Sequence, residues 1–211
     1  MIRNLLFDMG GIVFRQNTEE AFRRFRAMGI DPAQYMGAYG QRGFFLDVES
    51  GTIDAPTFCE RMAAATGRAS ISFEEAQQCW LGFLQDVPVE RLHTLLELKP
   101  HYHLCLLSNT NPFIMQHMRS EAFSADGLPI THYFHSLFCS YELGICKPHP
   151  DCFRRALDAD GMCAEESLFI DDSMRNIEAA AALGIQVLHV ETNADWRAPL
   201  AEILDKASHS L

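Results

Sequence analysis

Five short apolar runs recur along the chain, and stretches with helical spacing separate them. The runs are rich in Leu, Ile, Val and Phe, and they cover residues 4–8, 103–108, 137–139, 168–171 and 186–190. Nearly continuous apolar character is typical of parallel strands that are covered on both faces. Strands that alternate with helices predict an α/β fold built on a doubly wound, Rossmann-like parallel sheet.

Three helices between these runs have clear boundaries. Residues 89–98 place their leucines on one stripe and end before a proline. Asn111 and Pro112 form an N-cap followed by a first-turn proline. Residues 174–183 are rich in alanine and stop at Gly184, a residue type favoured just beyond a helix. These helices fit the crossover connections that a parallel sheet requires.

One long segment, residues 15–86, interrupts this alternation, and its pattern looks purely helical. Its capping residues are Asn17 or Thr18, Asp54, and Ser72 with Glu75 as a capping box. We therefore expect a helical cap over residues 15–86, inserted into an α/β core that comprises residues 1–14 and 87–211.

Composition and charge narrow the functional classes. The chain has 211 residues, of which 48% are apolar and 21% charged, as in a globular domain. Its net charge of −11 disfavours nucleic-acid partners, and no run approaches the ~20 apolar residues of a membrane span. The seven cysteines are odd in number and form no C-x-x-C pair, which predicts reduced thiols in a cytoplasmic protein. We expect a monomer or a homodimer.

Polar residues stand where several predicted strands end. Asp8 ends the first run, Ser108 the second, and Asp171 with Asp172 the fourth, while Lys147 follows the third after a loop. Ligands of open α/β sheets bind beyond the carboxyl ends of the strands, so these side chains should converge. Clustered carboxylates require a cation to stay ionised together, and oxygen ligands suit Mg²⁺.

This set of residues can transfer a phosphoryl group. Asp8, partly neutralised by a metal and by Lys147, can attack phosphorus and form an acyl phosphate. Ser108 and backbone N–H groups can donate to phosphoryl oxygens. Asn176, one helical turn beyond Asp172, can brace the metal ligand or the lysine.

Four motifs in this order resemble the haloacid dehalogenase superfamily. They occupy residues 5–11, 106–111, 147–148, and 169–173 with Asn176. The resemblance covers essentially the whole chain, because the insertion lies where the C1-capped subfamily I has its helical cap. It implies the strand order 5-4-1-2-3. Within the superfamily, the motifs resemble those of bacterial glucose-1-phosphatase-type sugar phosphatases.

The resemblance also implies roles for individual residues. The catalytic residues would be Asp8 as the nucleophile, Ser108, Asn109 and Lys147. The Mg²⁺ ligands would be Asp8, the Gly10 carbonyl and Asp172, with Asp171 holding a metal-bound water. The implied substrate is a small phosphorylated metabolite, with a sugar phosphate favoured, and the implied intermediate is an aspartyl phosphate on Asp8.

One position departs from the pattern of this superfamily. Most of its phosphatases carry an acid–base aspartate two residues after the nucleophile, where this chain has Gly10. General acid–base help contributes ~10²–10⁴-fold to the rate. The enzyme could therefore act on esters with good leaving groups, or water, a substrate hydroxyl or a cap residue could replace the aspartate. Relatives of the glucose-1-phosphatase type also carry glycine here, which favours these two outcomes.

Two rival functions remain open, as does the identity of the substrate. A phosphate-binding or regulatory relative with weak catalysis would explain Gly10. A 2-haloacid dehalogenase would use the same aspartate without metal, but it would not need Asp171 and Asp172. Substrate choice would lie in the cap, whose candidate contacts are Arg15, Arg42, Phe44, Phe45 and the turn at residues 49–51.

Overall fold

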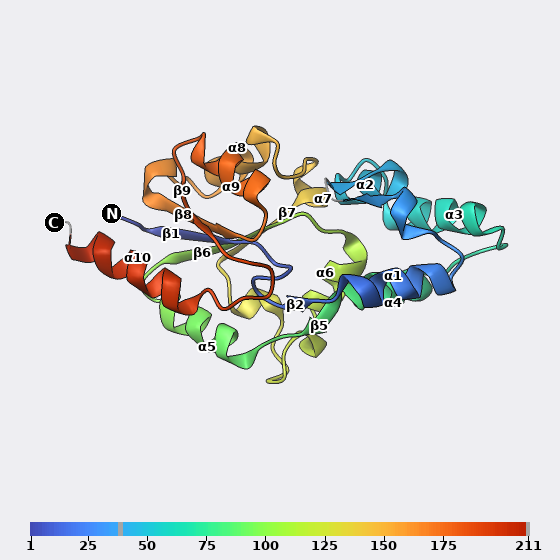
Figure 1. Cartoon of the computed structure of the whole chain (residues 1–211), viewed down its shortest axis with the longest axis horizontal. Coiled ribbons are helices and arrows are strands. Elements are labelled where there is room, and N and C mark those ends of the chain that lie inside the picture. Colours follow the sequence, from blue (N-terminus) through green and yellow to red (C-terminus); the bar gives the residue numbers. More distant parts are fainter. Residues whose placement is uncertain (38–39, 210–211) are drawn as a thin grey trace.

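A parallel sheet of five strands lies at the centre of the computed structural model, which describes residues 1–37 and 40–209 (Figure 1). The strands, in spatial order, are β7 (Ser136–Cys139), β6 (His103–Ser108), β1 (Asn4–Phe7), β8 (Ser167–Asp171) and β9 (Gln186–His189). All neighbouring pairs are parallel. The predicted fold class and the order 5-4-1-2-3 are confirmed, with strand ends that differ from the prediction by one residue at most.

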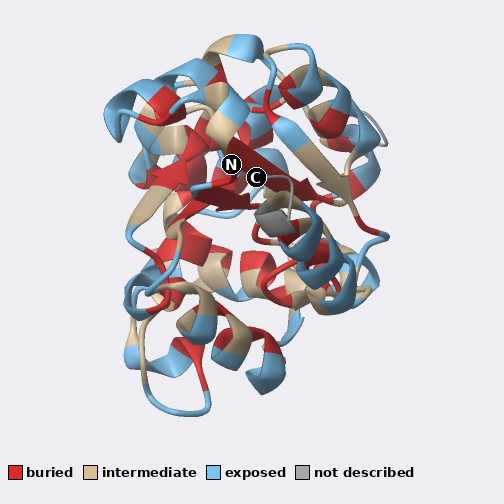
Figure 2. Cartoon of the chain, turned by 90° about the vertical axis from the view of Figure 1, so that its left-hand side faces the viewer, coloured by how far each residue is buried: buried red, intermediate tan, exposed pale blue. Residues whose placement is uncertain are grey.

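Helices cover both faces of the sheet, and the alternation of side chains along β1 decides which residues meet them. Leu5 and Phe7 belong to the larger buried cluster, which also contains residues of α5 (Val89–Leu98), α6 (Pro112–Met118) and α10 (Arg197–His209). Leu6 belongs to a second cluster with α8 (Pro150–Ala159) and α9 (Met174–Ala181). Figure 2 shows the buried strands between helices whose outer surfaces are exposed.

The predicted helix ends follow the expected capping chemistry. The side chain of Asn111 accepts a hydrogen bond from the Ile114 backbone N–H, and Pro112 opens α6. Beyond the C-terminal end of α9, Gly184 has φ +84°, a conformation that glycine adopts without steric cost. The predicted cap at Asn111 is confirmed, whereas α9 ends at Ala181, two residues before the predicted end.

Four helices of the inserted segment are α1 (Thr18–Ala27), α2 (Gly43–Glu49), α3 (Ala55–Thr66) and α4 (Phe73–Trp80). Asn17 and Asp54 cap α1 and α3, and Ser72 forms the predicted capping box with Glu75. The expectation of a purely helical segment was wrong. β2 (Arg15–Gln16) pairs with β5 (Leu84–Asp86), and β3 (Met36–Gly37) pairs with β4 (Gly40–Gln41). Strands of two or three residues carry no periodic signal that a sequence pattern could reveal.

These helices lie at one end of the molecule, beyond the carboxyl ends of the sheet strands (Figure 1). Aromatic rings fill their interior, with Phe45 contacting both Phe25 and Trp80 at centroid distances of 5.1 and 5.3 Å. Phe113 of α6 contacts Phe58 at 5.2 Å, so the same ring cluster reaches the core helices. The division into a cap at 15–86 and a core at 1–14 and 87–211 stays a prediction, and residues 38–39 and 210–211 of those ranges lie outside the described residues.

Shorter elements complete the chain. They are α7 (Ser140–Leu143) and the 3-10 turns η1 (Pro32–Gln34), η2 (Leu81–Phe83), η3 (Glu121–Phe123), η4 (Ile130–His132) and η5 (Ala164–Glu166). Within the described residues, every helix is too short or too polar to cross a lipid bilayer.

Candidate active site

Asp8 stands directly after β1, at the carboxyl edge of the sheet. Its backbone N–H donates to the Ile170 carbonyl at 2.9 Å, which continues the pairing of β1 with β8. The chain then turns sharply through Gly11, whose φ is +80°. A Cβ atom at Gly11 would lie 2.7 Å from Asp172 Oδ2. Glycine is required here because the loop after Asp8 passes directly against the Asp172 carboxylate.

The Lys147 ammonium joins two carboxylates from neighbouring strands. Its Nζ donates to Asp8 Oδ1 at 2.7 Å, to Asp171 Oδ2 at 2.8 Å and to the Leu107 carbonyl at 2.8 Å. Burial opposes the charged form of this lysine, but the attraction of Asp171 and Asp8 outweighs burial and raises its pKa. Lys147 is therefore a fixed positive charge beside Asp8.

Three carboxylates gather around this charge. Asp8, Asp171 and Asp172 each place an oxygen within 4.8 Å of the others. When ionised they carry three negative charges against the single positive charge of Lys147. The pKa of Asp8 is raised to about 7, because burial and the Asp171 and Asp172 carboxylates together outweigh the attraction of Lys147. Oxygen donors with uncompensated negative charge fit a hard divalent cation such as Mg²⁺, which would neutralise the cluster.

Donors on the protein already hold Asp171 in place. Asn176 Nδ2 lies 3.1 and 3.0 Å from the two carboxylate oxygens, and the Ser173 backbone N–H donates to Oδ1 at 2.7 Å. With Lys147 on Oδ2, each oxygen accepts two hydrogen bonds. This arrangement makes Asp171 an anchor for the lysine, as expected of the brace at Asn176. The contact of Asp171 with a metal-bound water stays a prediction.

Asp172 faces the same cluster from the beginning of the next loop. Thr192 Oγ1 donates to its Oδ2 at 2.6 Å. Burial raises the pKa of Asp172, the bond from Thr192 lowers it, and the nearby Asp171 carboxylate adds to the rise. A cation shared with Asp8 would relieve this penalty.

Ser108 and Asn109 follow β6 and close another side of the site. Asn109 Nδ2 donates to the Lys147 carbonyl at 2.9 Å, and the Lys147 backbone N–H donates to Asn109 Oδ1 at 2.8 Å. The Asn109 side chain thus fixes the loop that carries the lysine. Ser108 is buried, and its Oγ lies 3.4 Å from the Asn109 carbonyl, a long contact that leaves the hydroxyl available to a ligand.

A cleft of about 180 Å³ opens over these residues. Its lining from the core includes Asp8, Gly10, Ser108, Asn109, Ile114, Lys147, Asp172 and Asn176, and its lining from the inserted segment includes Gln16, Gln41, Glu49, Trp80 and Phe83. All the sequence-predicted catalytic residues line the cleft, together with Gly10 and Asp172, while Asp171 lies buried beneath it.

Of the cap residues expected to face the site, the structure brings Glu49 to the cleft. Arg15 instead pairs with Asp86 at 3.6 Å, and Phe44 and Phe45 pack within the aromatic interior of the helices. Arg42 approaches Gly37, where a Cβ atom would lie 2.6 Å from the guanidinium. Arg15 and Arg42 therefore lie outside the lining of the cleft, and the polar groups that the described cap residues bring to it are the Gln16 and Gln41 amides, the Trp80 indole and the Glu49 carboxyl.

Sequence reasoning missed Gln16 and Gln41, because both lie in two-residue strands without a periodic signal. The Asn193 side chain holds the Gln16 backbone through two hydrogen bonds. The Gln16 backbone N–H donates to Asn193 Oδ1 at 2.8 Å, and Asn193 Nδ2 donates to the Gln16 carbonyl at 3.0 Å. Asn193 has φ +68°, a conformation that asparagine tolerates better than most residues. The contact joins positions far apart in the sequence, so local pattern could not reveal it.

A buried arginine, Arg91 of α5, supports the loops beneath the cleft. Its guanidinium donates to four carbonyls, of Gly11 at 3.2 Å, Ile12 at 2.8 Å, Asn193 at 2.7 Å and Ala194 at 2.8 Å. These carbonyls belong to the loop after Asp8 and to the loop after β9. Arg91 therefore fixes both loops against each other, and sequence analysis did not single it out.

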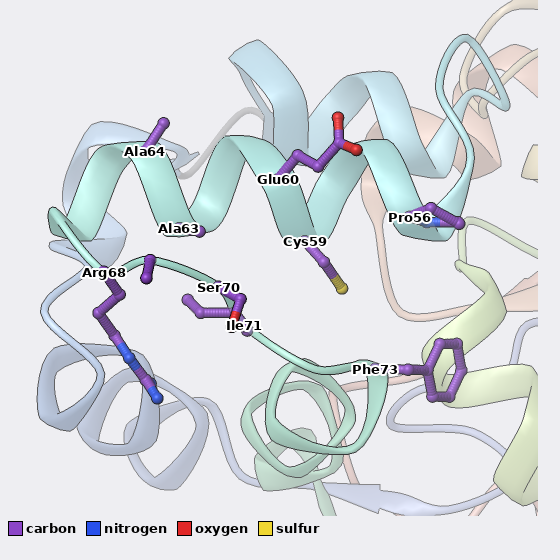
Figure 3. Close-up of a pocket in the computed structure, with 10 residues that line it drawn as sticks. Pro56, Cys59, Glu60, Ala63, Ala64, Arg68, Ser70, Ile71 and Phe73 are labelled. Atoms are coloured by element: carbon purple, nitrogen blue, oxygen red, sulfur yellow. The ribbon is translucent and has the colours of Figure 1, made fainter.

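A larger hollow of about 590 Å³ lies between α3 and the following loop (Figure 3). Figure 3 shows Cys59 on α3 and Arg68 and Ile71 on the loop that runs past it. Among the described residues that line it, Glu60 and Arg68 are the charged ones. It lacks the convergent carboxylates and the lysine of the cleft over Asp8, so size alone does not make it the candidate active site.

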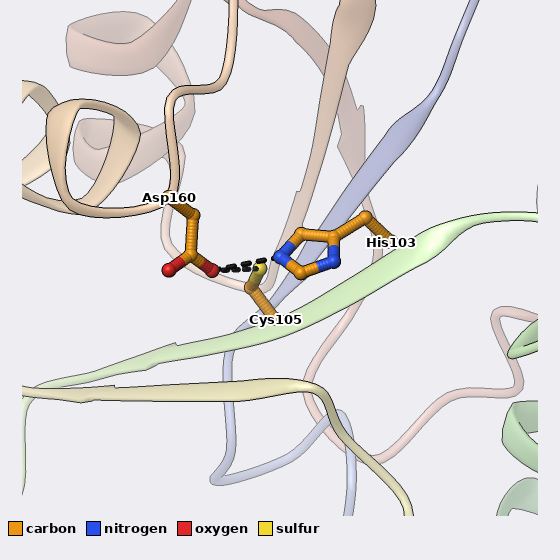
Figure 4. Close-up of side chains that lie close together, drawn as sticks. All are labelled: His103, Cys105 and Asp160. Atoms are coloured by element: carbon orange, nitrogen blue, oxygen red, sulfur yellow. Dashed lines mark hydrogen bonds and ion pairs between the residues drawn. The ribbon is translucent and has the colours of Figure 1, made fainter.

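A second group of possible metal ligands consists of His103, Cys105 and Asp160 (Figure 4). His103 Nε2 lies 2.7 Å from Asp160 Oδ2, and the Cys105 thiol donates to the same oxygen at 3.7 Å. Burial raises the pKa of this thiol, which disfavours the thiolate that binds metals. The group lies at the amino end of β6, whereas Ser108 ends that strand, and its contacts tie the end of α8 to the sheet.

Comparison with known proteins agrees with this geometry. The profile of the haloacid dehalogenase-like hydrolases matches residues 2–184. The chain belongs to this family. It is 36% identical over 206 residues to a D-ribitol-5-phosphate phosphatase of Bacteroides thetaiotaomicron, covering 97% of this chain and 100% of the relative.

Solved structures of the family superpose closely. A predicted HAD-like family hydrolase of Porphyromonas gingivalis has a TM-score of 0.91 at 33% identity, covering 97% of this chain and 98% of the other. A HAD family enzyme of Bacteroides thetaiotaomicron, in complex with magnesium and inorganic phosphate, has a TM-score of 0.85 at 30% identity, with coverage of 94% and 99%.

Proposed function

We propose that this HAD-like hydrolase is a Mg²⁺-dependent phosphatase of a small sugar phosphate or sugar-alcohol phosphate, with Asp8 as the nucleophile. The observation that carries the proposal is the contact of one buried lysine, Lys147, with both Asp8 and Asp171, beside a third carboxylate within 4.8 Å. Oxygen ligands and one fixed cation suit a dianionic phosphoryl group and a divalent metal. Magnesium and phosphate in a related structure support the same chemistry.

The protein's residues would divide the reaction as follows. Asp8 attacks phosphorus, the ester oxygen leaves, and an aspartyl phosphate forms. Lys147 and donors at Ser108 balance the charge on the phosphoryl oxygens. Water then hydrolyses the aspartyl phosphate and restores Asp8. Asp8, the Gly10 carbonyl and Asp172 would hold Mg²⁺, which supplies charge neutralisation and orients the phosphoryl group.

The wall opposite Asp8 supports a polyhydroxylated substrate. Gln41 Oε1 and Trp80 Nε1 have no hydrogen-bond partner among the described residues, and both residues line the cleft. Both atoms are buried, so hydroxyl groups of a sugar or sugar alcohol, which donate and accept, would satisfy them once the side chains turn toward the cleft. The relative that acts on D-ribitol 5-phosphate supports this substrate class. A cytoplasmic location agrees with the seven unpaired cysteines.

The experiment is a screen of phosphorylated metabolites with Mg²⁺ and with EDTA, using Asp8→Asn as the control variant. We expect turnover of a five- or six-carbon polyol or sugar phosphate that EDTA and the substitution both abolish. Phosphate binding without turnover would instead favour the alternative function, a phosphate-binding or regulatory protein with weak catalysis, which Gly10 leaves open. Activity that survives EDTA on a 2-haloacid would favour the dehalogenase.

A further inference from the structure

The cleft geometry places the leaving group of a phosphate ester against the cap. In-line displacement requires the attacking and leaving oxygens to lie on opposite sides of phosphorus. With Asp8 attacking from the tip of β1, the ester oxygen points away from the sheet. The residues of the inserted segment that line the cleft, beyond the carboxyl edge of the sheet, are Gln16, Gln41, Glu49, Trp80 and Phe83.

Neither Gly10 nor the side chain nearest to it can supply a proton to that oxygen. A Cβ atom at Gly10 would lie 2.9 Å from Gln16 Oε1, so the Gln16 amide occupies the space where a side chain at position 10 would begin. An amide has no proton that it can transfer at neutral pH. The proton donor must therefore come from elsewhere in the cleft.

Glu49 is the one carboxylic acid among the described cap residues that line the cleft. It is 7% exposed, and its side chain accepts one long hydrogen bond, of 3.4 Å from Gln41 Nε2. Burial raises the pKa of Glu49 to about 8, and the bond from Gln41 opposes this rise. A carboxyl group in this state holds its proton near neutral pH and can release it to a developing alkoxide.

The end of α2 is fixed to the core, which gives Glu49 a defined place over the site. Ser140 Oγ donates to the Glu49 carbonyl at 2.6 Å and accepts from the Thr110 backbone N–H at 2.9 Å. Gly51 packs so closely against the Tyr141 backbone carbonyl that a Cβ atom at this position would overlap it. Thr110 lies two residues after Ser108, so these contacts tie Glu49 to the loop that borders the phosphoryl site.

We propose that Glu49 is the general acid and base of the reaction, taking the role that Gly10 cannot fill. This inference rests on the proposed phosphatase function. As Asp8 bonds to phosphorus and the ester bond breaks, the Glu49 carboxyl proton passes to the leaving oxygen, which departs as an alcohol. The Glu49 carboxylate then takes a proton from the water that attacks the aspartyl phosphate. Inorganic phosphate leaves, and both Glu49 and Asp8 return to their starting states.

The test compares two leaving groups in Glu49→Gln and in a control variant, Glu60→Gln, which changes an exposed acid of α3. p-Nitrophenolate departs without a proton, whereas the alkoxide of D-ribitol 5-phosphate requires one. With Mg²⁺ present, Glu49→Gln should lower kcat/KM, which reports the steps up to departure of the leaving group, by ~10²–10⁴-fold for the alkyl ester and leave kcat/KM for p-nitrophenyl phosphate nearly unchanged. Hydrolysis of the aspartyl phosphate, which both esters share, should slow to the same extent for both. The control should behave as wild type on both esters.

A second variant tests the same role by rescue. The backbone at Gly10 does not have a positive φ, and the atom that an added Cβ would meet is the flexible end of Gln16. Adding Gly10→Asp to Glu49→Gln should restore part of the lost activity toward the alkyl ester. Equal losses of kcat/KM on both esters, or a loss on the alkyl ester that comes from a raised KM with an unchanged kcat, would overturn the role of Glu49. A wild-type protein inactive on both esters would instead overturn the proposed function.

Discussion

Replacing Glu49 with glutamine should change the pH dependence of stability in the metal-free protein. Burial raises the pKa of this carboxyl to about 8 from an ordinary value of 4.5. The folded state therefore binds more protons than the unfolded state within that window, and stability falls as pH rises from the unfolded pKa toward the folded one. Glutamine has nearly the same shape, can still accept from Gln41, and does not titrate.

The magnitude follows from linkage. If the shift acts in full, wild type loses about 4 kcal/mol between about pH 5 and about pH 8.5 through this one group. Opening of the cap that lets water reach the carboxylate would reduce this loss. Gln41 donates a hydrogen bond to the Glu49 carboxyl, and the charge of Glu49 contributes to the raised pKa of the nearby Cys146 thiol. Both are unchanged in the variant.

Urea denaturation with EDTA at the two pH values measures the effect. The difference in unfolding free energy between Glu49→Gln and wild type should move in favour of the variant as pH rises. Other groups that titrate in this range, such as Asp8, largely cancel in that difference. Glu60→Gln should show no such trend. A difference that stays constant with pH would mean that Glu49 ionises normally, and this would refute the reasoning.

Two further substitutions test the contacts beneath the cleft. Lys147→Met leaves the buried carboxylates of Asp8 and Asp171 without their shared partner. We expect the free energy of unfolding of the metal-free protein, measured by urea denaturation, to fall by ~3–5 kcal/mol. An unchanged denaturation midpoint would contradict the buried ion pairs. Arg91→Met removes a donor from four carbonyls, of which Ile12 keeps Trp196 Nε1 at 2.8 Å and Gly11 keeps the Asn193 backbone N–H at 3.1 Å. We expect the free energy of unfolding to fall by ~2–4 kcal/mol and amide hydrogen exchange in the loop after Asp8 to become faster. Unaltered hydrogen exchange in that loop would argue against the role of Arg91 in fixing it.

The sheet and the residues at its edge could be predicted because their signals are local. Each strand is a short apolar run, and the polar residue at its end follows in the sequence, as Asp8 follows β1 and Ser108 ends β6. Parallel strands bring such ends to one edge, so convergence follows from topology alone. Helix caps at Asn111 and Ser72 are likewise encoded within four residues.

The wall of the cleft could not be predicted, because long-range docking sets its residues. Gln16 takes its place through Asn193, which is far away in the sequence. Glu49 takes its place through Ser140 and through the close approach of Gly51 to the core. Neither contact leaves a periodic trace along the chain. Sequence analysis named the turn at residues 49–51 among several candidates, and only packing distinguished Glu49 from Arg15 or Phe45.

The most direct test is a crystal structure of the protein with Mg²⁺ and beryllofluoride, which imitates a phosphoryl group bonded to a carboxylate. We expect beryllium bonded to an oxygen of Asp8, fluorine atoms beside Lys147 and Ser108, and one Mg²⁺ ion that contacts Asp8, the Gly10 carbonyl and Asp172. Beryllofluoride bound away from Asp8, or a metal ion that Asp8 and Asp172 do not share, would contradict the account.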